Sequence, residues 1–579
     1  MKFASRRRRT ARLAVLFALS VSLSTSPSAV RPASGQGPTI ADLAVRELSA
    51  KIPLWVKEGN VPGAAAAIVD DKGILWQGVY GTTILGGDKA VTPETIFSIQ
   101  SMSKSFTALT VLAAVQEGKL DLDAPVVKYL PDFRVNSRYE DAPEAKMTLR
   151  HLLAHRAGFT HEAPLGGNFD DRPHTFPEHV RSISDTWLRY PVGYRYSYSN
   201  LGIDLAGYIV EKVYGMPFHR VVKEKILNPL GMTSSTLDID EIMKSDRRAV
   251  GHAFPMSDSD GGIPVIVPMI AAGGVYTNIR DMAEYLRFHM NKGLVEGRQI
   301  LKRELIEEMH AVAFPERHQR SGYGLCMEKA VVGETYLLNH GGGGYGFITS
   351  MTIYPEIKLA VVTLSNSAAS RLTGGRIMGV INPLIIKNRG QARPRPEQSD
   401  IDESKTVPAA DPRLREIVGL YENNTKIGNK DGIFGISAGG RFYPLKMFAD
   451  GGGLVGLFAD YSELRIKPRR LDQPGTLIQL DRLTGAVVFN DFLKPEAGDD
   501  KPGPNKSEWR KYLGTYKALA WGRRPRATFK VAVANGYLTL GDERCREHLP
   551  GLFFTPSGEA LDFRGAISTF RNIMLIRTD

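Results

Sequence analysis

The sequence predicts an α+β protein in which an antiparallel sheet is flanked by helices, with an inserted helical region, and is followed by an all-β, barrel-like C-terminal region. Short β-rich runs occur near both ends of the first 390 residues, and helical periodicity dominates between them. Beyond about residue 412 the sequence is composed mainly of short strand-like runs. At 579 residues the chain is too long for one hydrophobic core, so we expect about two to four domains.

The first 35 residues have the composition of a secretory signal peptide. Six basic residues up to Arg12 precede an apolar run at 13–23, and no acidic residue occurs before Asp42. A basic segment followed by a short apolar segment is typical of export. We therefore expect a periplasmic or extracellular protein, attached to a membrane only if this leader stays uncleaved.

The elements of the first large domain, predicted over residues 36–390, follow in order. Residues 40–57 have helical spacing, and residues 64–70 and 74–80 flank a glycine-containing turn, which predicts a hairpin. The clearest later helices are expected at 106–117 and 203–213. Strand character returns in three runs, at 335–339, 347–354 and 359–364.

A polar, proline-containing segment at 391–411 is predicted to be a linker. Two β-barrel-like domains are predicted after it, at 412–500 and 501–579. The strongest hairpin signal of the chain is Asn535-Gly536, which joins two β-rich runs. One split barrel would explain the same pattern.

The formal charge of +12 does not indicate a nucleic-acid partner. Removal of the six basic residues of the leader lowers it to +6. The two cysteines, Cys326 and Cys545, lie far apart without neighbouring histidines, so we expect buried thiols rather than a disulfide framework or a zinc site. We expect no cofactor and no metal.

The SxxK motif of the chain is Ser101-Met102-Ser103-Lys104. An extended segment precedes it and a helix follows, which places Ser101 near a helix start, where free backbone N–H groups favour an oxyanion. The spacing of three puts Lys104 on the same helical face. A lysine in an apolar pocket loses its proton more readily and can activate the hydroxyl. An ordinary helix cap with a solvent-facing lysine would give the same pattern.

Two further motifs could complete a site. Tyr198-Ser199-Asn200 stands on a predicted tight turn into a helix, and a phenol beside a lysine can accept the serine proton. His340 is followed by four glycines, including Gly342 and Gly343, at the end of a β-run. Glycines let a substrate backbone approach the strand, and the N–H groups of Gly343 and Ser101 could form an oxyanion hole.

Together, in order and spacing, these motifs resemble the serine β-lactamase and penicillin-binding family, specifically its class C-like peptidases and esterases. Segments at 148–159, 118–123 and 272–277 resemble further sequence motifs of that branch. The resemblance covers residues 40–387. It implies a β-lactamase/DD-peptidase-like fold. His155 invites a Ser/His/Asp interpretation, but no GxSxG segment surrounds Ser101 and the resemblance makes this histidine structural.

The resemblance implies acyl transfer, in which Ser101 attacks a carbonyl, Lys104 and Tyr198 move the proton, and Asn200 holds Lys104 and a substrate amide. Lactamases and DD-carboxypeptidases commonly carry lysine where this chain has His340, which similar D-aminopeptidases and esterases share. We therefore expect hydrolysis of amide bonds in D-amino-acid-containing peptides, with ester or β-lactam hydrolysis as alternatives. A penicillin-binding sensor or scaffold that is acylated without turnover is a further alternative, and the C-terminal barrels could bind a cell-envelope ligand.

Overall fold

The computed structural model describes residues 37–388, except 169, 171, 253–267 and 315–320. From 404 to 579 it describes all residues except 416–417, 421–425, 439–440, 451–452, 458–462, 467–476, 481–486, 489–502, 520–524, 542 and 556–557. The predicted leader and most of the predicted linker lie outside these residues.

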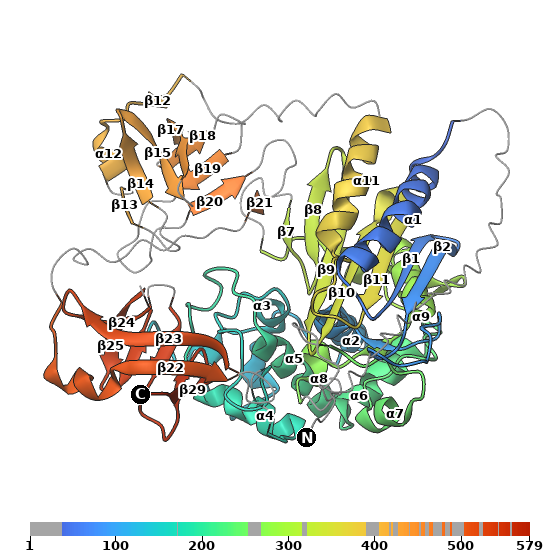
Figure 1. The fold of residues 1–579 in the computed structure, drawn as a ribbon, viewed down its shortest axis with the longest axis horizontal. Helices are drawn as coiled ribbons and strands as arrows, with labels where there is room; N and C mark the ends of the chain where they lie inside the picture. The colour runs from blue at the N-terminus through green and yellow to red at the C-terminus, as the bar shows by residue number, and fades with distance from the viewer. Residues whose placement is uncertain are drawn as a thin grey trace, which may run out of the picture. The chain divides into compact units, whose positions relative to one another are not determined.

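A seven-stranded antiparallel sheet organises the first domain, with the strand order β2-β1-β11-β10-β9-β8-β7 (Figure 1). The expected α+β class is confirmed, since the first and last strands of the domain pair with each other and helices fill the sequence between them. The strands of this sheet are β1 Gly63–Asp70, β2 Ile74–Gly81, β7 Gly322–Tyr323, β8 Glu328–Val332, β9 Thr335–Gly344, β10 Phe347–Tyr354 and β11 Leu359–Ser365.

Among the residues that the structure describes, the helices range from single turns to five turns, and two short strand pairs lie among them. The helices are α1 Ile40–Glu58, α2 Ser103–Gln116, α3 Leu149–Leu153, α4 Phe176–Ser182, α5 Asn200–Tyr214, α6 Phe218–Val222, α7 Ile239–Lys244, α8 Ile270–Gly273, α9 Ile279–Met290, α10 Arg303–His310, α11 Gly374–Asn388 and α12 Pro412–Arg415. The strand pairs are β3 Phe97–Ser98 with β4 Tyr276–Thr277, and β5 Leu294–Val295 with β6 Arg298–Gln299.

Alternation along β1 explains the layers, because successive side chains of a strand point to opposite faces. Ala64, Ala66 and Ile68 belong to the core shared with α1 and α11. Ala65, Ala67 and Val69 belong to the larger core that includes α2 and α9. Both faces of the sheet are therefore covered by helices (Figure 1).

The helix α2 is buried on all sides from Ser103 to Ala114 rather than along one face. Its hydroxyl groups are satisfied within the protein. Ser105 donates to the Met102 carbonyl, Thr107 to Ala271 and Thr110 to Phe106. Polar side chains can line a central helix when each finds such a partner.

The C-terminal strands form a closed barrel in the order β22 to β29. Its strands are β22 Gly514–Leu519, β23 Pro525–Ala534, β24 Tyr537–Leu540, β25 Glu543–Leu549, β26 Leu552–Phe554, β27 Ala560–Asp562, β28 Ser568–Phe570 and β29 Ile573–Arg577. Asn535 and Gly536, with φ of 49° and 76°, form the expected turn between β23 and β24.

Two open sheets precede the barrel among the described residues. One has the order β12-β17-β18-β19-β20-β21 and the other β13-β14-β15-β16. Their bounds are β12 Thr406–Val407, β13 Gly419–Leu420, β14 Lys426–Lys430, β15 Ile433–Ala438, β16 Arg441–Pro444, β17 Lys446–Asp450, β18 Gly453–Leu457, β19 Glu463–Ile466, β20 Leu477–Leu480 and β21 Val487–Val488. The strand β12 lies inside the segment predicted to be a linker.

Both cysteines are buried free thiols, as expected. Over the described residues we find no helix with the length and apolar character needed to cross a membrane.

Candidate active site

Ser101 and Lys104 meet at the start of the central helix. Ser101 lies in a 3₁₀ turn, Gln100–Met102, that runs directly into α2. The Lys104 ammonium group donates hydrogen bonds to Ser101 Oγ at 3.0 Å and to the Ala272 carbonyl at 2.9 Å. The Lys104 side chain is completely buried, whereas Ser101 is partly exposed. The solvent-facing lysine that would accompany an ordinary helix cap is therefore not what the structure contains.

Tyr198 lies against the same amine, with the Lys104 nitrogen 5.1 Å from the centre of its ring. The loop between α4 and α5 holds the tyrosine. Ser197 N–H donates to the His155 carbonyl at 2.7 Å, and Ser199 N–H donates to His155 Nδ1 at 3.2 Å. The His155 and Tyr198 rings are 4.4 Å apart. Burial, followed by the nearby Lys104 charge, lowers the pKa of His155 well below its ordinary value, so this histidine is a neutral support for the loop.

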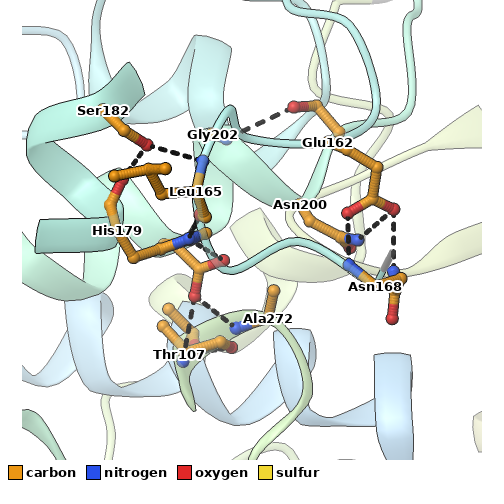
Figure 2. A network of polar contacts seen from close by, with 12 residues as sticks. Thr107, Glu162, Leu165, Asn168, His179, Ser182, Asn200, Gly202 and Ala272 are labelled. Carbon is orange, nitrogen blue, oxygen red and sulfur yellow. Dashed lines mark hydrogen bonds and ion pairs between the residues drawn. The ribbon is translucent and has the colours of Figure 1, made fainter. Parts of the chain in front are cut away.

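Asn200 begins α5 and is buried. Its side-chain amide donates to Glu162 Oε1 at 3.4 Å (Figure 2). The expected hydrogen bond between Asn200 and Lys104 is not among the contacts of the described residues. Lys104 bonds Ser101 and Ala272 instead.

Glu162, which the sequence did not single out, is the centre of a polar network beside Tyr198. It is 2% exposed and accepts a hydrogen bond from His161 Nδ1 at 2.5 Å. It also accepts hydrogen bonds from the backbone and side chain of Asn168 (Figure 2). Burial alone would raise the pKa of this carboxyl, but the hydrogen bonds and charge of His161 and those from Asn168 outweigh it and lower the pKa. The His161 ring stacks on Tyr198 with centroids 5.5 Å apart.

The glycine segment after His340 runs beside the nucleophile. Strand β9 continues through Gly344, and its residues 340–344 pair with β10 on one side. Strand β8 pairs only with residues 335–339, so within the described sheet the other edge of the glycine segment has no strand partner. An added Cβ at Gly342 would lie 2.1 Å from the Ile99 carbonyl, two residues before Ser101. Gly342 therefore permits the close approach of β9 to the Ser101 turn.

His340 is buried and its two ring nitrogens have different partners. Nδ1 lies 2.7 Å from the Gly341 carbonyl and Nε2 lies 3.0 Å from the Tyr323 hydroxyl. A carbonyl only accepts, so Nδ1 carries the proton and Nε2 accepts from Tyr323 in the neutral ring. Burial, and next the Lys104 charge, lower the pKa of His340 to about 4. At neutral pH this residue supplies no positive charge.

Gln100, immediately before Ser101, has an unusual backbone for a residue with a side chain, with φ of 50°. Its amide donates to Ser98 Oγ at 2.6 Å, and Gly344 lies against its side-chain oxygen. Gln100, Gly274 and Tyr345 border a cavity of about 460 Å³ whose other lining includes the apolar side chains of Phe176, Leu237, Ile239, Met269 and Ile270. Gln100 precedes Ser101 in the chain, but Ser101 itself is not among the residues that line this space.

The structure thus brings Ser101, Lys104 and Tyr198 together and places Gly342 beside them. Sequence reasoning missed Glu162 and the Ala272 carbonyl. The Ala-Gly-Gly motif at 272–274 could have pointed to Ala272. Glu162 had no comparable signal, because an isolated glutamate in a loop is usually exposed.

The chain is similar to known proteins over the domain that contains this site. The family model described as Beta-lactamase matches residues 42–376. An unguisins hydrolase, ungD', from Aspergillus campestris (strain IBT 28561) is 29% identical over 325 residues, covering 54% of this chain and 59% of the relative. Protein flp from Staphylococcus aureus (strain MRSA252) is 24% identical over 322 residues, covering 54% of this chain and 60% of the relative. The match therefore spans about three fifths of each relative.

A crystal structure of SurE has a similar fold, with a TM-score of 0.52 and 20% identity, covering 79% of this chain and all of that one. The family match extends over more than half of the sequence and contains all the motifs described above. From its sequence and its fold, the chain belongs to the beta-lactamase family.

Proposed function

We propose that the protein is a serine hydrolase that works through an acyl-enzyme on Ser101. The observation that carries this proposal is the contact between the buried Lys104 amine and Ser101 Oγ, 3.0 Å apart, with the Tyr198 ring beside the same amine. A nucleophile within hydrogen-bond reach of a base is the arrangement that covalent catalysis needs. The name of the unguisins hydrolase denotes hydrolysis for that relative and supports the same reaction class.

In the proposed reaction Ser101 Oγ bonds to the carbonyl carbon of the substrate, and its proton passes to the phenolate form of Tyr198 or to the neutral form of Lys104. The backbone N–H groups of Ser101 and Gly343 stabilise the oxyanion. The C–N bond, or C–O bond of an ester, then breaks, and the leaving group takes the proton. Water attacks the acyl-enzyme along the reverse proton path and releases the acid.

The neutral state of His340 favours substrates without a carboxylate next to the glycine strand. A lysine at this position would supply a permanent cation, whereas His340 has its pKa lowered to about 4 and both ring nitrogens are occupied. Penicillins and C-terminal D-alanyl peptides carry a carboxylate there, by the resemblance to the family. We therefore place β-lactam hydrolysis and DD-carboxypeptidase action behind amide hydrolysis.

The Glu162 carboxylate supports a substrate that carries an amine. Its lowered pKa keeps it ionised, and its oxygens are bound to Asn200 and Asn168, next to Tyr198. The negative charge on this side, partly balanced by the contact with His161, attracts an ammonium group more than a carboxylate. We propose D-amino-acid amides and short peptides with a free amino terminus as the substrate class. Export, as the leader predicts, would bring the enzyme to the D-amino-acid peptides of a cell envelope.

Purified protein should be assayed against D-alanine and L-alanine p-nitroanilides, p-nitrophenyl esters of increasing acyl length and a chromogenic cephalosporin, with Ser101→Ala as the control. The proposal expects D-alanine p-nitroanilide to have the highest kcat/KM and Ser101→Ala to be inactive. Preference for esters, with a chain-length optimum set by the cavity, would make it an esterase. Activity retained by Ser101→Ala would overturn the mechanism itself.

A further inference from the structure

The Lys104 amine depends on a backbone carbonyl for its position. One of its two hydrogen bonds runs to Ser101, and the other runs to the Ala272 carbonyl in α8. A lysine side chain has four rotatable bonds, so a second fixed partner determines where the nitrogen lies. Whatever fixes the backbone of α8 therefore fixes the amine.

Two side chains hold the peptide unit between Ala271 and Ala272 from opposite ends. Asp204 Oδ1 accepts hydrogen bonds from Ala271 N–H at 3.1 Å and from Ala272 N–H at 3.0 Å. Thr107, one turn after Lys104 on α2, donates to the Ala271 carbonyl at 2.7 Å. Both ends of this peptide unit are thus bound to neighbouring helices.

His179 completes the support behind Asp204, and both side chains are fully buried. His179 Nε2 lies 3.2 Å from Asp204 Oδ2, and Nδ1 lies 2.6 Å from the Leu165 carbonyl. Figure 2 shows His179 and Leu165 on one side of this network and Thr107 and Ala272 on the other. Burial alone would lower the pKa of His179, but the hydrogen bond and charge of Asp204 and the Leu165 carbonyl raise it. The charged imidazole can donate to both acceptors, which compensates the buried carboxylate.

The helix α5 connects this support to the other half of the site. It begins at Asn200, two residues after Tyr198, and Asp204 follows one turn later. The contact between α5 and α8 is tight, because an added Cβ at Gly207 would lie 2.4 Å from Ala271 Cβ. Asp204 thereby links the element that carries Tyr198 and Asn200 to the backbone that holds Lys104.

We propose that Asp204, held by His179, is a positioning residue that fixes the Ala271–Ala272 backbone and so aims the Lys104 amine at Ser101. The inference rests on the proposed function. Because Asp204 acts on the base and does not line the cavity that Gln100 borders, its loss slows the acylation step and leaves substrate affinity nearly unchanged.

The test is the rate at which a fluorophosphonate probe labels Ser101, resolved into a maximal rate and a half-saturating concentration by intact-mass spectrometry. For Asp204→Asn we expect the maximal rate to fall about 10- to 100-fold, and the half-saturating concentration to change less than about threefold. The matched control is Asp281→Asn. Asp281 is another buried aspartate, which bonds Ser234 and Ser235 away from α8, and this change should leave the labelling rate unaltered.

Thr107→Val keeps the test decisive if Asp204→Asn does not fold. It removes the other hydrogen bond to the same peptide unit and should slow labelling about 3- to 10-fold. An unchanged maximal rate in either folded variant overturns the proposal, as does an equal loss in Asp281→Asn. Failure of the unaltered protein to react at Ser101 would instead contradict the proposed function, so the two failures are distinguishable.

Discussion

At the scale of single residues, the site depends on burying a lysine without leaving it unpaired. Lys104 is completely buried, yet a serine hydroxyl, a backbone carbonyl and a tyrosine ring surround its nitrogen. These contacts hold the amine within hydrogen-bond reach of the hydroxyl that it would activate. The Lys104 nitrogen therefore lies where a proton acceptor for the Ser101 hydroxyl has to be.

Replacement of this lysine should remove most of the activity. We expect Lys104→Met, which keeps an unbranched side chain one atom shorter than lysine, to lower kcat/KM about 10²- to 10⁴-fold through loss of proton transfer. The thermal midpoint should fall only slightly, because an apolar group fills the space while the Ala272 carbonyl loses one hydrogen bond. Steady-state kinetics and thermal unfolding of the same preparation check both expectations. Full activity in the folded variant would show that Lys104 is not the base.

At the scale of elements, the close approach of β9 to the Ser101 turn gives a steric prediction. An alanine Cβ at position 342 would lie 2.1 Å from the Ile99 carbonyl and 2.3 Å from Thr349 Oγ1. Gly342→Ala should therefore lower the free energy of unfolding by about 1–3 kcal/mol and displace the nucleophile. Chemical denaturation measures the loss.

The neighbouring glycine is the control for that prediction. At Gly343 the nearest atom to an added Cβ is the terminal methyl group of Ile348 at 3.4 Å. The free energy of unfolding of Gly343→Ala should thus be close to that of the unaltered protein. Equal stability of the two variants would mean that β9 does not press on the Ser101 turn as described.

Elements with strong local signals were predictable from the sequence. The helix at 40–58, the β1–β2 hairpin and the Asn535-Gly536 turn follow from periodicity and turn chemistry. The extension of β9 through Gly344 did not follow, since glycine has low strand propensity and pairing with β10 overrides it. The contacts of Glu162 and Asp204 join distant segments, which no local pattern reveals.

At the scale of the whole molecule, buried neutral histidines make the fold sensitive to acid. His289 and His310 contact each other at 2.9 Å in the core, and burial lowers the pKa of His289 to about 3. His340 has its pKa lowered to about 4. The unfolded chain takes up protons near pH 6.5, where these rings stay neutral in the folded state.

The unfolding free energy should therefore fall as the pH falls from about 6.5 to 4, with each fully buried ring contributing up to about 3 kcal/mol. His289→Gln keeps a hydrogen-bonding group for His310 and should flatten this slope by up to about 1.4 kcal/mol per pH unit. Urea unfolding at a series of pH values measures the slope. An identical slope in His289→Gln would show that this ring is not a neutral core residue.

The most direct test of the central claim is intact-mass and peptide-mapping spectrometry of the protein after exposure to a fluorophosphonate probe, with Ser101→Ala treated in parallel. The account predicts a single adduct on Ser101 and none on the variant, because Lys104 activates that hydroxyl alone. An adduct that persists in Ser101→Ala, or that maps to another residue, would contradict it.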